Sequence, residues 1–126
     1  CKKQKIQNIW MPGYQDNITE ILLNSDIYLS TARWEGMPLS VIEAMACGLP
    51  VVASNVVGNQ DTIVDGKSGF FYNLGEIEAA KSKIYYLKNN RKVRMKMIEN
   101  AQQRQRKLFS NDKMRELTYA VYNDIL

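Results

Sequence analysis

Two carboxylates, those of Glu35 and Glu43, flank the stretch of this sequence that is best suited to chemistry, with seven residues between them. We predict a helix in this stretch, from about Pro38 to Cys47. Proline is favoured in the first turn of a helix, and Gly48 suits the left-handed conformation that ends one. Glu35 then precedes the helix and Glu43 lies in its second turn. Acids at such positions can simply cap a helix or complement its dipole, which is the alternative to a ligand site.

The start of this predicted helix is a natural seat for a phosphate. The backbone amides of Leu39 and Ser40 are expected to be free, the helix dipole is positive there, and Gly36 has no side chain to block close approach. The two carboxylates would repel an anion that they touched. They are better placed to accept hydrogen bonds from hydroxyl groups on either side of it. This indicates a ligand with a central phosphate and polyol groups at both ends, which is the layout of a nucleotide-sugar.

The elements around this stretch alternate between strands and helices. We predict strands at about 7–11, 26–31, 50–54 and 69–72, and helices at about 18–24, 38–47 and 59–64, with Asp16 or Asn17 as the cap of the first helix. Such alternation predicts a parallel α/β sheet with helices on both faces. Ligands of these sheets bind beyond the carboxyl ends of the strands, and Glu35 follows one such end.

After Asn73 the pattern becomes helical, and three amphipathic helices are predicted. Apolar residues recur at helical spacing at Ile77, Ala80, Ile84 and Leu87, at Val93, Met97 and Ala101, and at Met114, Leu117, Val121 and Ile125. We therefore divide the chain into an α/β part, residues 1–75, and a helical part, residues 76–126, of one domain.

Residues 34–52 read WEGMPLSVIEAMACGLPVV. This string resembles the signature of the retaining glycosyltransferases called group 1 or family 4, whose Glu-x7-Glu motif lies in the donor-binding, C-terminal half of a GT-B fold. The segments on either side agree, so that the resemblance covers about residues 6 to 75. It implies a Rossmann-like parallel sheet that forms part of a C-terminal GT-B domain, with a helical C-terminal tail.

The resemblance also implies roles for individual residues. Glu43 would bind the ribose hydroxyls of a nucleotide, and Glu35, the candidate catalytic residue, would contact the donor sugar near the reacting centre. The remaining donor-binding candidates are Gly36, Met37, Leu39 and Ser40 for the diphosphate or sugar, and Gly13 and Tyr14, in the loop from Met11, for the nucleobase. Transfer would retain the anomeric configuration. It would need no cofactor and no protein-bound metal, and its donor would be a UDP-, GDP- or ADP-sugar.

A chain of 126 residues fits one compact domain and is too short for a complete GT-B enzyme. It starts without a methionine and only a few residues before its first predicted strand. We therefore expect that it is a piece of a longer protein, and that an N-terminal acceptor domain of the same chain is missing. The isolated piece is expected to be inactive.

Composition limits the other possibilities. The net charge of +4 is mostly due to basic residues at the start and between Lys81 and Lys107, which indicates a solvated helical face, with contact to an anionic membrane surface as the alternative. We expect no nucleic-acid partner, because no basic stripe is interleaved with aromatic residues. The sequence has two cysteines and no histidine, so neither a disulfide framework nor a histidine-based site has support. We therefore expect the protein to be cytoplasmic, either free in the cytoplasm or peripheral at the inner face of the membrane.

The leading hypothesis from the sequence is the donor-binding part of a retaining glycosyltransferase in the assembly of surface polysaccharides or glycolipids. A non-catalytic nucleotide-binding or regulatory α/β module is the alternative. A nucleic-acid-binding α/β domain is a distant third.

Overall fold

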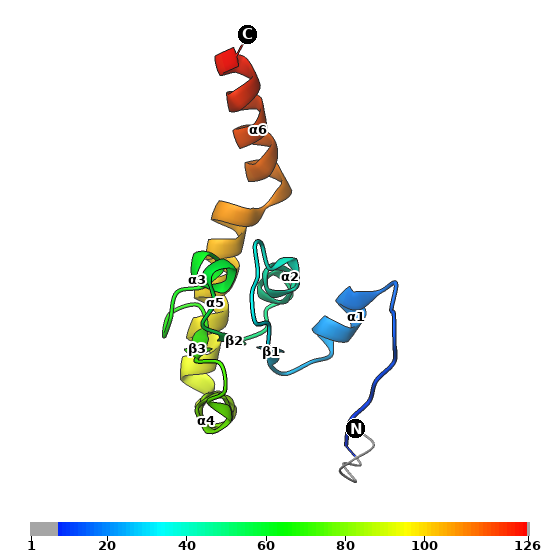
Figure 1. Ribbon diagram of the computed structural model, residues 1–126, viewed down its shortest axis with the longest axis vertical. Helices are drawn as coiled ribbons and strands as arrows, with labels where there is room; N and C mark the ends of the chain where they lie inside the picture. Colours follow the sequence, from blue (N-terminus) through cyan, green and yellow to red (C-terminus); the bar gives the residue numbers. More distant parts are fainter. Residues whose placement is uncertain (1–7, 126) are drawn as a thin grey trace.

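The computed structural model describes residues 8–125, which contain a parallel sheet of three strands in the order β1-β2-β3 (Figure 1). The strands are β1 (Tyr28–Ser30), β2 (Val51–Ser54) and β3 (Phe70–Tyr72). The helices are α1 (Ile18–Leu23), α2 (Leu39–Ala46), α3 (Val57–Thr62), α4 (Ile77–Asn89), α5 (Arg91–Phe109) and α6 (Asn111–Ile125). In the register, Leu29 pairs with Val52, which in turn pairs with Phe70. The predicted α/β class with a parallel sheet is confirmed.

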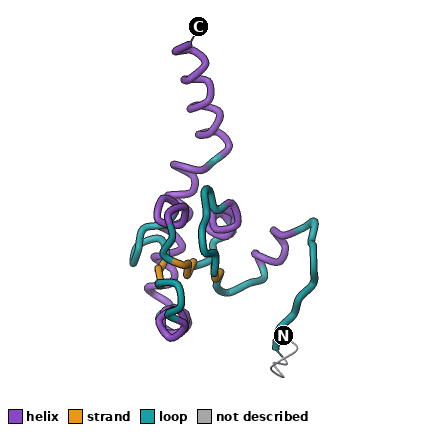
Figure 2. Tube along the Cα trace, viewed as in Figure 1, coloured by secondary structure: helices purple, strands orange, loops and turns teal. Residues whose placement is uncertain are grey.

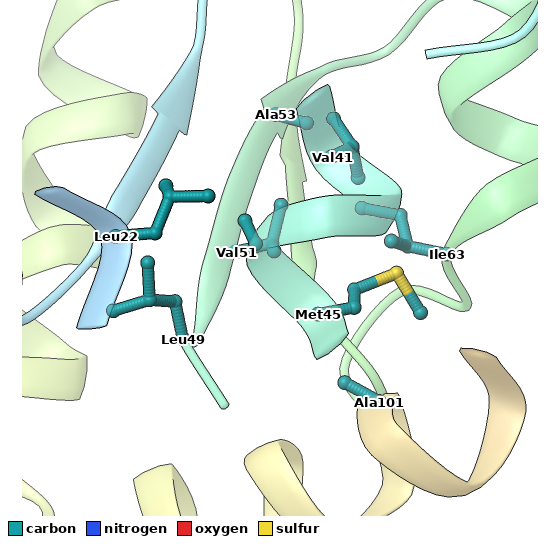
Figure 3. Close-up of a cluster of buried hydrophobic side chains, with 9 residues drawn as sticks. Leu22, Val41, Met45, Leu49, Val51, Ala53, Ile63 and Ala101 are labelled. Atoms are coloured by element: carbon teal, nitrogen blue, oxygen red, sulfur yellow. The ribbon is translucent and has the colours of Figure 1, made fainter. Parts of the chain in front are cut away.

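Helices cover both faces of the sheet, and β2 lies in its centre (Figures 1 and 2). All four residues of β2 are buried, and its three apolar residues alternate between two apolar clusters. Val51 and Ala53 pack with α2 and with Ala101 of α5, as Figure 3 shows. Val52 faces the other way and packs with Leu87 of α4. Burial on both faces is the reason why the first three residues of this strand are all apolar.

Helix α2 forms as the sequence predicts. Its inner side consists of Val41, Ile42, Ala44 and Met45, all of which are buried. The chain leaves the helix through Gly48, whose φ of 77° lies in the left-handed region that glycine adopts without strain. The half-buried Cys47 packs against the same core as a free thiol. The apolar side of α2 thus packs on the core, and the opposite side, here called its outer side, is exposed.

The long helix α5 joins the ends of three other helices by side-chain hydrogen bonds to their last carbonyl groups. Arg94 donates to the carbonyls of Leu87 and Lys88 at the end of α4, at 3.0 and 3.1 Å. Arg104 donates to those of Asp61 and Thr62 at the end of α3, both at 2.7 Å, and Gln102 donates to Ala46 O of α2 at 3.4 Å. These carbonyls have no partner within their own helices, so part of the basic excess serves as helix caps.

The last two helices follow the predicted periodicity, but α6 buries none of its apolar residues. In α5, Met97 and Ala101 are buried as expected. In α6, Met114, Leu117, Val121 and Ile125 are 53–75% exposed, and the helix projects away from the rest of the chain (Figure 1). None of the helices within residues 8–125 is long and apolar enough to cross a membrane.

The predicted strand at 7–11 is wrong over its described residues, 8–11, which form no regular element. Ile9, Trp10 and Met11 are 49–74% exposed, and the segment runs apart from the sheet (Figure 1). A strand needs a neighbour for its amides and carbonyls, and this segment has none among residues 8–125. The helix that follows begins as predicted, because the Asn17 side chain accepts a hydrogen bond from the Glu20 amide at 3.3 Å.

Candidate functional site

The candidate site lies at the edge of the sheet where the three parallel strands end. The loop of residues 31–38 leads from β1 to α2 and carries Glu35, which is half-buried. Glu35 lies at this edge because it belongs to the short loop that connects the end of a strand to the start of the next helix. Beyond the carboxyl ends of parallel strands is where ligands of such sheets bind.

Pro38 shapes the turn into α2. Its φ of −78° and ψ of 79° are those of an inverse γ-turn, and the Leu39 amide accordingly donates to Met37 O at 2.9 Å. The amides of Val41 and Ile42 both donate to Pro38 O. The expectation that the Leu39 amide is free is therefore wrong. Proline fixes φ, and together with the ψ of Pro38 this gives a tight turn that uses the Leu39 amide, so that Pro38 caps the helix rather than starting it.

Three other amides at this turn remain open. Those of Gly36, Met37 and Ser40 have no hydrogen-bond acceptor among residues 8–125. The Gly36 backbone has a negative φ, and a Cβ added there would meet no atom within 4 Å. Nothing in the packing of the described residues requires a glycine at this position. The space beside Gly36 and the open amides fit a ligand that carries an anionic group.

The outer side of α2 carries the second carboxylate. Leu39, Ser40 and Glu43 are exposed, and positions three and four apart lie on the same face of a helix. Glu43 therefore lies on the face that begins at the open amide of Ser40. Neither Glu35 nor Glu43 forms an ion pair with a basic side chain of residues 8–125. Both carboxylates are available to accept hydrogen bonds from a ligand.

The structure adds Gly58, in the first turn of α3, to this site. Its amide donates to Glu35 O at 3.2 Å, and a Cβ built on it would lie 2.6 Å from both Glu35 O and Gly36 O. A side chain at this position would collide with the loop that carries Glu35. The site predicted from the sequence does not include this residue, because the contact joins segments that are 23 positions apart in the chain.

The predicted nucleobase residues, Gly13 and Tyr14, are not brought together with the rest of the site. They lie in a separate loop before α1, in which the Gln15 side chain donates to Pro12 O and Tyr14 O, and Tyr14 is 90% exposed (Figure 1). A shallow hollow beside α1 is lined in part by Trp10, and neither Glu35 nor Glu43 contributes to it. The nucleobase assignment stays a prediction.

The described residues offer no ready place for a metal ion. Within residues 8–125 no group of three or more His, Cys, Asp or Glu side chains could hold one. The loop and the start of α2 can bind an anion through their backbone amides. They can also bind the hydroxyl groups of a ligand through the carboxylates of Glu35 and Glu43.

Solved structures place this fold among the glycosyltransferases of the GT-B class. One of them is a variant of Staphylococcus aureus TarM, solved with fondaparinux, alpha-GlcNAc-glycerol and UDP. It superposes on this chain with a TM-score of 0.83 and 29% sequence identity, and the match covers 92% of this chain and 24% of TarM. The family model of the group 1 glycosyl transferases matches residues 2–104, and the chain belongs to this family. Its place in the C-terminal domain of the fold, predicted from the sequence, is confirmed.

Two relatives show how the chain compares in length with whole enzymes. N-acetyl-alpha-D-glucosaminyl L-malate synthase of Bacillus anthracis is 29% identical over 114 residues, which are 90% of this chain and 30% of the relative. UDP-Gal:alpha-D-GlcNAc-diphosphoundecaprenol alpha-1,3-galactosyltransferase of Escherichia coli is 37% identical over 67 residues, 53% of this chain and 17% of the relative. The chain thus spans less than a third of either protein.

Proposed function

We propose that this chain is the donor-binding part of an enzyme that transfers a sugar from a nucleotide-sugar to a glycan or lipid-linked acceptor, with retention of the anomeric configuration. One observation carries the proposal. At the carboxyl edge of a parallel sheet, the open amides of Gly36, Met37 and Ser40 lie on one loop and helix start, with a free carboxylate on either side. Amides suit a diphosphate, and carboxylates suit the hydroxyl groups of ribose and of a sugar.

Each residue has a distinct part in this proposal. The amides of Gly36, Met37 and Ser40 hold the diphosphate. Glu43, on the outer side of α2, accepts hydrogen bonds from the ribose, and Glu35, before the turn, accepts them from the donor sugar near the bond that breaks. Leu39 uses its amide within the turn, so it contributes only its side chain, which is 62% exposed.

The relatives support a nucleotide-sugar as the donor, but they do not indicate which acceptor receives the sugar. The TarM variant was solved with UDP, and the name of the E. coli enzyme gives a UDP-sugar as its donor. Their acceptors differ: one relative is named for a product built on L-malate and another for transfer to a diphosphoundecaprenol-linked sugar. Both relatives match this chain over only part of their own length, so we infer that acceptor choice lies in the parts outside the match. Assembly of surface polysaccharide or glycolipid in the cytoplasm is the pathway that we propose.

We propose that residues 1–126 form one domain, and that the longer protein supplies the acceptor domain. The chain alone is therefore expected to transfer no sugar, whereas the full-length protein transfers it, because reaction requires both substrates to be held together. A donor screen with UDP-, GDP- and ADP-sugars, run on both proteins, tests this. Sugar transfer by the chain alone would refute the proposal that the acceptor domain is required for transfer. Nucleotide binding by the full-length protein without any transfer would favour a non-catalytic module instead.

A further inference from the structure

The loop that carries Glu35 is held by hydrogen bonds from three neighbouring elements, all directed at its backbone carbonyls. Tyr72 Oη of β3 donates to Ser30 O at 3.0 Å, where the loop leaves β1. Ser54 Oγ of β2 donates to Ala32 O at 2.5 Å. The Gly58 amide of α3 donates to Glu35 O at 3.2 Å. The loop is therefore fixed at its beginning, in its first half and at Glu35 itself.

The side-chain donors of this set are deeply buried. Tyr72 is 9% exposed and Ser54 is fully buried. Burial raises the pKa of the Tyr72 phenol, so that its hydroxyl stays protonated and able to donate. Ser54 is held in turn by the fully buried Asn59, whose Nδ2 donates to Ser54 O at 2.9 Å and to Ser54 Oγ at 3.4 Å. Among residues 8–125 the buried Asn59 Oδ1 has no partner, but each donor of this set would lose its acceptor by moving, which opposes movement.

The third donor depends on close approach of two backbones. The absent side chain of Gly58 allows the first turn of α3 to lie against the carbonyls of Glu35 and Gly36, where a Cβ would have only 2.6 Å. The other end of α3 is held by the two hydrogen bonds from Arg104. The position of α3 is thus set by α5, and α3 in turn sets the position of the loop.

We propose that Tyr72, Ser54 and Gly58 are positioning residues for sugar transfer, which hold the backbone of the loop so that the Glu35 carboxylate meets the donor sugar. The inference rests on the proposed function of Glu35. It adds that the orientation of this side chain is determined by β2, β3 and α3, none of which touches the donor in the proposed arrangement. Glu43 and Ser40 lie on α2, which packs on the core by its own apolar side, so their contacts with the nucleotide are not expected to depend on these residues. The amides of Gly36 and Met37 lie in the held loop, so part of the diphosphate contact is expected to weaken with it.

The test is Tyr72→Phe in the full-length protein, with Tyr85→Phe as the matched control. Both changes remove one hydroxyl from a tyrosine, but Tyr85 is 53% exposed on α4 and makes no side-chain hydrogen bond within residues 8–125. We expect Tyr72→Phe to lower kcat at saturating donor by about tenfold or more, because small errors of placement at a reacting centre have large effects on rate. The UDP dissociation constant, measured by calorimetry, is expected to rise by a much smaller factor than kcat falls, because Ser40 and Glu43 on α2 still hold the nucleotide. Ser54→Ala is expected to show the same separation of kcat from UDP affinity.

The outcomes are distinguishable. A kcat for Tyr72→Phe equal to that of Tyr85→Phe, in a wild type that transfers sugar, would overturn the positioning role and leave the proposed function intact. A fall in UDP affinity as large as the fall in kcat, in both Tyr72→Phe and Ser54→Ala, would also overturn it, since that is the result of partial unfolding. Absence of transfer by the wild type with every donor would instead refute the proposed function, and the positioning role with it.

Discussion

Glu43→Ala is expected to weaken nucleotide binding by roughly 10- to 150-fold, because a hydrogen bond to a charged group contributes about 1.5 to 3 kcal/mol. Glu43 is exposed on the outer side of α2 and makes no ion pair within residues 8–125, so its loss leaves no buried group without a partner. The fold should be unchanged. The effect should therefore appear in the dissociation constant for UDP, GDP or ADP, measured by calorimetry on the full-length protein.

Glu78→Ala is the matched control for this change. Glu78 is also an exposed helical glutamate, and its ion pair with Lys81, at 3.1 Å, lies on the surface of α4, where such pairs contribute little. The control should bind nucleotide as the wild type does. Equal affinity of Glu43→Ala and Glu78→Ala, with both proteins folded, would rule out the ribose role of Glu43.

Met45→Ala is expected to destabilise the protein by about 2 to 5 kcal/mol, through lost burial and the cavity that remains. Met45 of α2 is fully buried in the cluster that also contains Ile63 and, from α5, Ala101 (Figure 3). Domains of this size are stable by only about 5 to 15 kcal/mol, so the variant should lose a large part of its stability. Urea denaturation of the 126-residue chain, followed by circular dichroism, measures the loss.

Met95→Ala is the control for the effect of removing a methionine from a helix. Met95 lies on α5 and is 54% exposed, so its truncation leaves no enclosed cavity. We expect its midpoint in urea to stay close to that of the wild type. Similar losses in the two variants would contradict the packing of α2 on α5, and with it the support for the helix that carries Glu43.

Much of this fold follows from local pattern. The buried strand at Val51–Ser54 and the helix at Leu39–Ala46 are marked by a short apolar run and by a proline and a glycine at the two helix ends. The segment 8–11 has the same apolar character but does not form a strand, because pairing is a property of two segments and cannot be read from one. Likewise, the periodicity of α6 predicts a helix but does not say what covers its apolar side.

The candidate site was predictable only in part. Glu35 and Glu43 are visible in the sequence because their spacing around a helix start is local. That the Leu39 amide is used within a turn depends on the backbone angles of Pro38, which a sequence pattern does not specify. The support of the loop by Tyr72 and Gly58 joins residues 42 and 23 positions apart, and only the folded chain brings them together.

The most direct test of the donor site uses the methionine methyl groups of the full-length protein, labelled with carbon-13, with the signals of the six methionines of this chain assigned by substitution. Met37 lies between the two glutamates, with its side chain 60% exposed, whereas Met95 and Met114 lie on the far helices. Saturation with the nucleotide that calorimetry shows to bind should shift the Met37 signal and leave those of Met95 and Met114 in place. An unmoved Met37 signal at saturation, or a shift at Met95 or Met114 in its place, would contradict a nucleotide-sugar site between Glu35 and Glu43.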